Sequence, residues 1–124
     1  LLEENHFALV GFTSGPYDLH LSIVENRLHF DIYPEGGGDL VRITLSMSPF
    51  RKLIRDYFTI CDSYFAAIKK SATTSQIESL DMGRRGLHDE GAEELRDRLA
   101  DRVAIDENTA RRLFTLICVL HIRN

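Results

Sequence analysis

The sequence predicts an α+β domain in which a three-stranded antiparallel β-meander is packed on one face by three to four α-helices. Two observations lead to this fold class. Apolar and polar residues alternate between residues 17 and 46, and apolar residues recur with helical spacing from Phe50 onward. The chain has 124 residues, of which 44% are apolar, enough to close one hydrophobic core. We therefore predict a single domain that spans residues 1–124.

Three successive segments have the period-two pattern of half-buried strands. Their apolar members are Tyr17, Leu19, Leu21 and Ile23 in the first, Leu28, Phe30 and Ile32 in the second, and Val41, Ile43 and Leu45 in the third. A tight turn at Glu25–Asn26 joins the first two strands, and the glycine-rich loop 34–39 joins the second to the third. The pattern predicts a meander with one apolar and one polar face, and it is compatible with a short additional strand at His6–Gly11.

A long amphipathic helix is predicted to follow the meander. Ser48 is interpreted as its N-cap and Pro49 as its first helical residue. From Phe50 to Lys70 the apolar residues share one broad stripe, and charged residues fill the other side. We expect this helix to lie across the apolar face of the sheet.

A second helix is predicted to begin at a capping box made by Ser75 and Glu78. Gly83 and Gly86 are expected to interrupt it, because glycine is a poor helix former. A helical pattern resumes after Asp89.

The last helix is predicted to be capped by Asp106, and residues 113–122 leave it almost no polar side. A helix that is apolar on nearly all sides is buried, either in the domain centre or in an interface. We therefore predict a homodimer that associates through this helix or through an open edge of the sheet.

Charge and cysteine usage exclude several classes of protein. The net charge of -4 gives no general attraction to phosphate backbones or anionic membranes, so neither nucleic acid nor a membrane is an expected partner. The run Leu113–Ile122 is too short to span a bilayer. Cys61 and Cys118 form no paired motif and are interpreted as reduced, buried residues, so we predict a cytoplasmic protein.

Three stretches, Ser48–Phe58, Asp81–Ala92 and Thr109–Leu116, are identified as a family pattern. They resemble the alphaproteobacterial uncharacterised protein family zero-two-six-two of the UPF series, and the middle stretch is the most specific of the three. The resemblance extends over essentially the whole chain. It implies a cytoplasmic protein and carries over no activity. Family members have an additional polar N-terminal segment, and Leu1–Asn5 reads like the end of a helix, so the chain is predicted to be a fragment.

The middle stretch contains a candidate site for an anionic ligand. Arg84 and Arg85 offer forked donors suited to phosphate or carboxylate, and His88 could act as an acid, a base or a further donor. The supporting residues are Asp81, Gly83, Gly86, Asp89 and Glu90. If the helix were unbroken, Arg84 and His88 would lie on its inner, apolar side, where each needs a partner.

The alternative interpretation of this segment is structural. In that case Arg84 pairs with Asp81 or Glu90, and His88 bonds a backbone carbonyl. A weaker candidate lies on the polar face of the first two strands, where His20 is predicted to face Asp31 and to lie diagonally from His29. These three side chains could hold a divalent metal, although ordinary cross-strand polar pairs explain them as well.

No catalytic motif and no cofactor-binding motif appears in the sequence, and we predict no cofactor. The preferred prediction is a small, non-enzymatic regulatory or adaptor protein that binds another, unknown protein. The alternative is an anion-binding domain, or an enzyme acting on a phosphorylated small molecule through residues 83–90.

Overall fold

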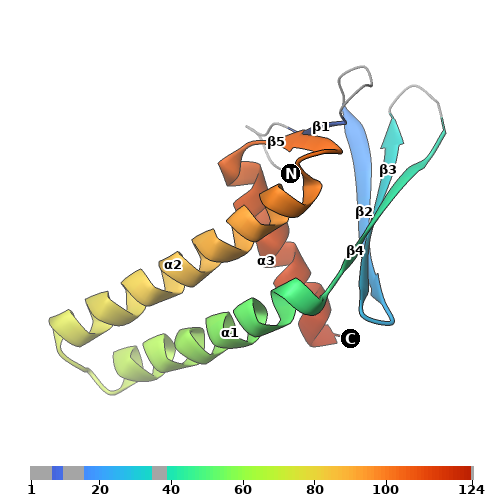
Figure 1. The fold of residues 1–124 in the computed structure, drawn as a ribbon. Coiled ribbons are helices and arrows are strands. Elements are labelled where there is room, and N and C mark those ends of the chain that lie inside the picture. The colour runs from blue at the N-terminus through green and yellow to red at the C-terminus, as the bar shows by residue number, and fades with distance from the viewer. Residues whose placement is uncertain (1–6, 10–15, 35–38, 124) are drawn as a thin grey trace.

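The computed structural model describes the backbone of residues 7–9, 16–34 and 39–123. It describes the side chains of the same residues as far as Ile122. Its elements follow the order ββββααβα (Figure 1). The strands are β1 (Phe7–Leu9), β2 (Tyr17–Val24), β3 (Arg27–Pro34), β4 (Val41–Ser46) and β5 (Val103–Ile105), and the helices are α1 (Ser48–Lys69), α2 (Thr74–Leu99) and α3 (Glu107–Arg123).

The predicted meander is confirmed as an antiparallel sheet with the order β2-β3-β4. Its register is the predicted one: Ile23 pairs with Leu28, and His20 pairs with Asp31. Glu25 and Asn26 both have positive φ angles, 49° and 66°, as the two central residues of a type I′ hairpin turn require. Asparagine tolerates this conformation better than most residues, so the turn forms without glycine.

The additional strand lies within the predicted segment, but it does not join the meander. β1 pairs with β5 in a separate two-stranded antiparallel sheet, in which Phe7 faces Ile105. The remaining residues of the predicted segment, His6, Val10 and Gly11, lie outside the described residues. A strand as short as β5 shows too little alternation to be recognised from its pattern alone.

Helix α2 corrects two predictions. It runs without a break through Gly83 and Gly86, and its capping box is formed by Thr73 and Gln76 instead of Ser75 and Glu78. A glycine costs a helix about 1 kcal/mol relative to alanine, which tertiary packing can offset. Gly83 faces Ile60 of α1 so closely that the two helices contact each other where a side chain would otherwise stand.

The start of α1 also differs from the prediction. The chain leaves β4 already in helical conformation at Met47, with φ of -74° and ψ of -15°, so Ser48 is helical and is not the N-cap. No side chain caps the helix, and the backbone N–H of Ser48 donates to Oγ of Ser46 over 3.2 Å. Pro49 is therefore the second helical residue and not the first, although it still lies in the first turn, where proline is tolerated.

The position of α1 was predicted wrongly. Only its first three turns reach the core: Phe50 and Ile54 are buried in it, and Leu53, Tyr57 and Phe58 pack against it. Beyond them α1 pairs with α2 in a helical hairpin that points away from the sheet, while α3 lies between this hairpin and the sheet (Figure 1). The apolar stripe of α1 therefore packs mainly against α2. We call residues 55–90 the arm, and none of them is fully buried.

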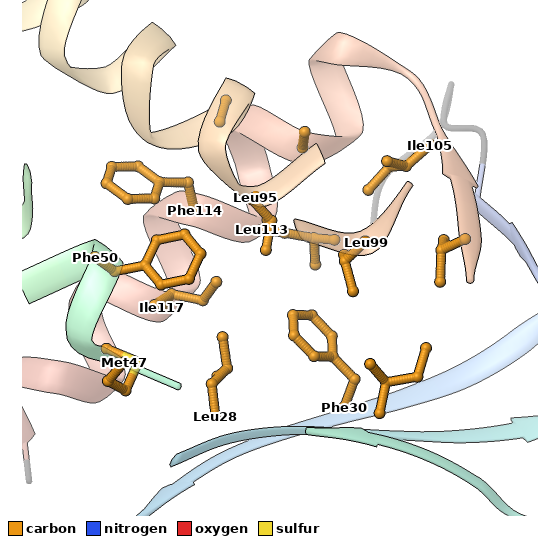
Figure 2. Close-up of a cluster of buried hydrophobic side chains, with 14 of the residues drawn as sticks. Leu28, Phe30, Met47, Phe50, Leu95, Leu99, Ile105, Leu113, Phe114 and Ile117 are labelled. Atoms are coloured by element: carbon orange, nitrogen blue, oxygen red, sulfur yellow. The ribbon is translucent and has the colours of Figure 1, made fainter. Parts of the chain in front are cut away.

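The hydrophobic core lies where the meander, α3 and the inner ends of α1 and α2 meet (Figure 2). Its largest fully buried side chains include Phe30, Phe50, Phe114, Leu95 and Ile117. Burial of each such side chain contributes about 1.5–3 kcal/mol relative to exposure. The core thus holds one end of the helical hairpin firmly and leaves the arm outside.

Candidate functional site

The unbroken course of α2 brings Arg84 and His88 onto one side of the helix, one turn apart. Both are partly buried and face the neighbouring helices. His88 lies between Tyr57 of α1 and Phe114 of α3, with ring centroids 5.4 Å away in each case. Arg84 and His88 thus lie on the inner side of α2, as the sequence predicted for an unbroken helix, and all three helices contribute to this polar cluster.

Arg84 has an intramolecular anion as its partner. Its Nη2 donates to Oδ1 of Asp81 over 2.6 Å, and Nε of Arg85 lies 3.1 Å from the other carboxylate oxygen. The guanidinium of Arg84 also lies 5.3 Å from the centre of the Tyr64 ring, within cation–π range. The hydrogen bond to Asp81 is the main cause of the raised pKa of Arg84. Asp81 thus engages both arginines of the predicted anion site.

His88 is held by a side chain and not by the backbone carbonyl of the structural interpretation. Its Nε2 lies 2.7 Å from Oγ1 of Thr115, and the Thr115 hydroxyl donates to the carbonyl of Arg111 over 3.1 Å. Because that hydroxyl proton is used, we assign the imidazole proton to Nε2, which donates to Thr115. Nδ1 is then an acceptor, buried and without a hydrogen-bond partner among the described residues.

The environment of His88 favours the neutral imidazole. Burial is the largest cause of its lowered pKa, followed by the positive charge of Arg111, while Asp89 acts in the opposite direction.

The supporting residues of the predicted anion site do not converge on Arg84 and His88. Oδ1 of Asp89 lies 3.3 Å from Nε of Arg111, so Asp89 pairs with a residue outside the predicted segment. Glu90 is exposed, and an added Cβ at Gly86 would meet no atom within 4 Å.

Sequence reasoning missed the contribution of α3 to this cluster. A shallow hollow of about 330 Å³ is lined by His88, Asn108, Arg111, Arg112 and Thr115. The Arg111–Arg112 pair is visible in the sequence, but its proximity to His88 depends on how α3 crosses α2, which no local pattern encodes.

The polar face of the β2–β3 hairpin has the predicted arrangement, and each of its three candidate metal ligands already contacts another side chain. Asp31 receives two hydrogen bonds from Arg42, of 2.6 and 2.8 Å, and these lower the pKa of Asp31. His29 Nδ1 lies 2.9 Å from the Thr44 hydroxyl, and the His20 ring packs against Tyr33. Among the residues that the structure describes, no three His, Cys, Asp or Glu side chains gather to hold a metal ion.

The buried cysteine, Cys118, offers no reactive group in the core, and Cys61 is only partly buried. Burial raises the pKa of Cys118 to about 12, so this thiol stays protonated at neutral pH and is a poor nucleophile. The chemistry available to the polar cluster is therefore that of one neutral imidazole and two arginines already paired with a carboxylate.

A second feature is an apolar groove of about 840 Å³ between β2 and α3. Its apolar lining comes from Phe7, Tyr17, Leu19, Leu21, Leu113 and Leu116. Among the described residues, large apolar side chains stay exposed in three parts of the fold: Leu116, Val119 and Ile122 on α3, Phe65, Ile68 and Met82 on the arm, and Val24 and Tyr33 on the sheet with Leu40 just before β4. The last helix was predicted to be buried in the domain centre or in an interface. The exposure of Leu116, Val119 and Ile122 excludes complete burial within the domain, and burial in an interface stays a prediction.

We expect Arg84→Ala to lower the free energy of unfolding by about 1–2 kcal/mol in the absence of any ligand. Breaking a fully buried ion pair costs about 3–5 kcal/mol. Here the side chains of Arg84 and Asp81 are 29% and 24% exposed, and Asp81 keeps Arg85 as a partner. Thermal and urea unfolding of both proteins, with and without inorganic phosphate, would measure the effect.

Arg85→Ala is the matched control, because Arg85 shares the same carboxylate and its side chain is 67% exposed. We expect a change below about 0.5 kcal/mol for this variant. A wild-type protein that is stabilised by phosphate, with the stabilisation lost in a normally stable Arg84→Ala variant, would support the anion site instead.

No helix in the described part of the chain is long and apolar enough to cross a membrane.

Comparison with known proteins places the chain in a family. The model of an uncharacterised protein family, UPF0262, matches residues 1–123. A UPF0262 protein of Paramagnetospirillum magneticum is 58% identical over 123 residues, which are 99% of this chain and 78% of the relative. UPF0262 proteins of Rhodospirillum rubrum and Rhizobium etli are 58% and 53% identical over the same length, covering 75% and 78% of those relatives.

No solved structure matches the chain. The names of the relatives state the family and no activity. The similarity over nearly the whole chain confirms the resemblance to the alphaproteobacterial family. The chain therefore belongs to the uncharacterised protein family UPF0262.

Proposed function

We propose that this protein is a non-enzymatic, cytosolic regulator or adaptor that acts by binding another protein and works as a homodimer. The observation that carries the proposal is the exposure of neighbouring large apolar side chains one turn apart on the same side of a helix, Phe65 and Ile68 on α1 and Leu116 and Val119 on α3. Grouped apolar side chains on a protein surface are typical of protein interaction sites, whereas scattered ones are common on any surface.

The arm is the proposed surface for the partner. Phe65 is 59% exposed, Ile68 is 46% exposed and Met82 is 74% exposed. Phe65 and Ile68 are three residues apart on α1, so they lie on the same side of that helix. Aromatic residues and methionine are enriched in protein interfaces, and anchors at this spacing are typical of a helix that docks in a groove.

The geometry of the polar cluster supports a binding role more than a catalytic one. Asp81 pairs with Arg84 and Arg85, and Thr115 bonds His88, so the predicted anion-binding residues have partners within the chain. A ligand at Arg84 or Arg85 would have to compete with a carboxylate fixed one turn away on the same helix. Anion binding through residues 83–90 is therefore the weaker proposal.

The test is capture of partner proteins from the native cytosol with the full-length protein, using the wild type and a Phe65→Ser, Ile68→Ser double variant. We expect a defined set of proteins to bind the wild type and to be lost with the double variant, because the apolar anchors of the arm are removed. Quantitative mass spectrometry would measure the loss, and circular dichroism would check that both proteins have the same helix content.

Leu40→Ser is the matched control, since Leu40 is 44% exposed and lies just before β4, away from the arm. This variant should capture the same proteins as the wild type. Equal capture by the arm variant and the wild type would argue against the arm as the binding surface. Enrichment of no protein at all would argue against the adaptor role.

A further inference from the structure

The two edges of the sheet differ in how completely their apolar faces are covered. In the described sheet β2 and β4 each pair only with β3, so both are edge strands. On β4 Ile43 is buried and its apolar neighbours are partly buried, whereas on β2 no apolar residue is fully buried, and Leu19 and Leu21 line the apolar groove. Edge strands with an uncovered apolar face are templates for pairing with another strand. The asymmetry between the two edges points to β2.

α3 adds exposed apolar surface beside the same edge. Leu116 is 51% exposed and lines the groove together with Leu19 and Leu21. Val119 is 43% exposed and Ile122 63% exposed, and these continue the row toward the end of α3. An occupant that covers the edge of β2 would therefore also meet an apolar row on the adjacent helix.

We propose that the occupant is a second copy of this chain, which pairs antiparallel with β2 about a two-fold axis at Leu19. The proposal rests on the homodimer of the proposed function and adds its geometry. The two meanders then form one continuous six-stranded sheet, because each contributes three strands. A two-fold axis perpendicular to this sheet keeps α3 of both copies on the same face.

The polar residues of β2 select the register. In an antiparallel pair about a two-fold axis, directly opposite residues lie on the same face of the sheet. Centring the axis on Leu19 places Asp18 of each copy opposite His20 of the other, and Tyr17 opposite Leu21. An axis centred on His20 would place the imidazoles of the two copies opposite each other. An axis centred on Leu21 would place Asp18 of one copy opposite Val24 of the other. Only the Leu19 register places the Asp18 carboxylate opposite an imidazole, whereas the His20 register would place it opposite Ser22 and bring two imidazoles together.

Asp18 and His20 are suited to this contact. Asp18 is exposed and makes no ion pair with any described residue. Within its own copy His20 faces Asp31, but both carboxylate oxygens of Asp31 accept from Arg42. An imidazole can donate a hydrogen bond to a carboxylate in either protonation state, so the pair does not depend on a charged His20.

The spacing of the helices fits the same arrangement. Paired strands lie about 4.8 Å apart, and packed helices lie about 8–10 Å apart. Phe30 of the central strand β3 is fully buried, whereas Leu19 of the edge strand β2 is partly exposed. The helical layer therefore covers the centre of the sheet more completely than its edge. If each helical layer is centred between β2 and β3, it lies about one strand spacing, about 4.8 Å, from the seam, so the two layers are about 10 Å apart, which is the distance of packed helices. Leu116 of each copy then lies at the seam.

Leu19→Cys tests the register directly. Opposite Cα atoms in an antiparallel pair are about 4.5–5.5 Å apart, within the range of a disulfide. We expect mild oxidation to link this variant into a covalent dimer, while wild type, with only Cys61 and Cys118, stays unlinked. Leu21→Cys is the matched control, because in this register its two copies lie four residues apart along the seam and should not react. Efficient linking through Leu21→Cys, with none through Leu19→Cys, would overturn the register.

Sedimentation equilibrium tests the surface without covalent chemistry. We expect a wild-type dimer, and a monomer for Leu116→Glu, because a carboxylate at the seam has no partner. Leu40→Glu, at a similarly exposed apolar position near the other edge, should remain dimeric. A dimer that Leu116→Glu leaves intact would overturn this geometry and leave the homodimer of the proposed function standing. A wild-type monomer at high concentration would overturn both the seam geometry and the homodimer. The adaptor role would then be tested by the capture experiment on the arm alone.

Discussion

Replacing Phe114 with alanine is expected to lower the free energy of unfolding by about 3–5 kcal/mol, the range for truncation of a buried aromatic ring. Phe114 is fully buried and joins all three helices. Its ring lies 6.3 Å from that of Tyr57 on α1 and 5.4 Å from that of His88, and it packs against Gly91 of α2. Urea unfolding monitored by circular dichroism would measure the loss.

Phe65→Ala is the control for this change, because it removes the same atoms from a side chain that is 59% exposed. We expect its effect to stay below about 0.5 kcal/mol at low protein concentration. Similar losses for the two variants would mean that Phe114 does not hold the helices together as the contacts indicate.

The second large effect is expected at Gly91, where alanine should destabilise the protein by about 1–3 kcal/mol. The new Cβ would overlap the ring of Phe114, which is enclosed by the core and cannot turn away freely. The overlap outweighs the gain in helix propensity of about 1 kcal/mol that alanine brings over glycine. The comparison uses thermal and urea unfolding of the variant and the wild type.

Gly86→Ala in the same helix is the matched control. An added Cβ at Gly86 meets no atom within 4 Å, so only the propensity term remains, and we expect stabilisation by about 0.5–1 kcal/mol. The two substitutions are chemically identical and should have opposite signs. Stabilisation by both would show that the Phe114 ring moves aside easily.

The meander was predictable because its signals are local. Alternation fixed which residues of each strand share a face, and the two-residue turn at Glu25–Asn26 then determined the register of β2 and β3. The break expected at Gly83 and Gly86 was wrong for the opposite reason. Glycine lowers helix propensity locally, but Gly83 allows α1 to approach α2, and that contact is between segments distant in sequence.

The candidate site was predictable only in its α2 half. Helical spacing places Arg84 beside His88, and the i, i+3 spacing makes Asp81 available to Arg84. The hydrogen bond from His88 to Thr115 spans 27 residues and depends on how α3 packs on α2. The position of α1 failed similarly, since an apolar stripe indicates that a helix is covered but does not indicate whether a sheet or another helix covers it.

The absence of any fully buried residue between Arg55 and Glu90 has a consequence for local unfolding. α1 has 22 residues, about 33 Å of helix, and its outer turns are held by α2 and by backbone hydrogen bonds more than by the core. Segments with few buried apolar contacts open at a lower free energy than the protein as a whole. We therefore expect the tip of the arm to open and close while the meander and Phe114 stay folded, and a protein that binds Phe65 and Ile68 to protect the amide protons of that tip from exchange.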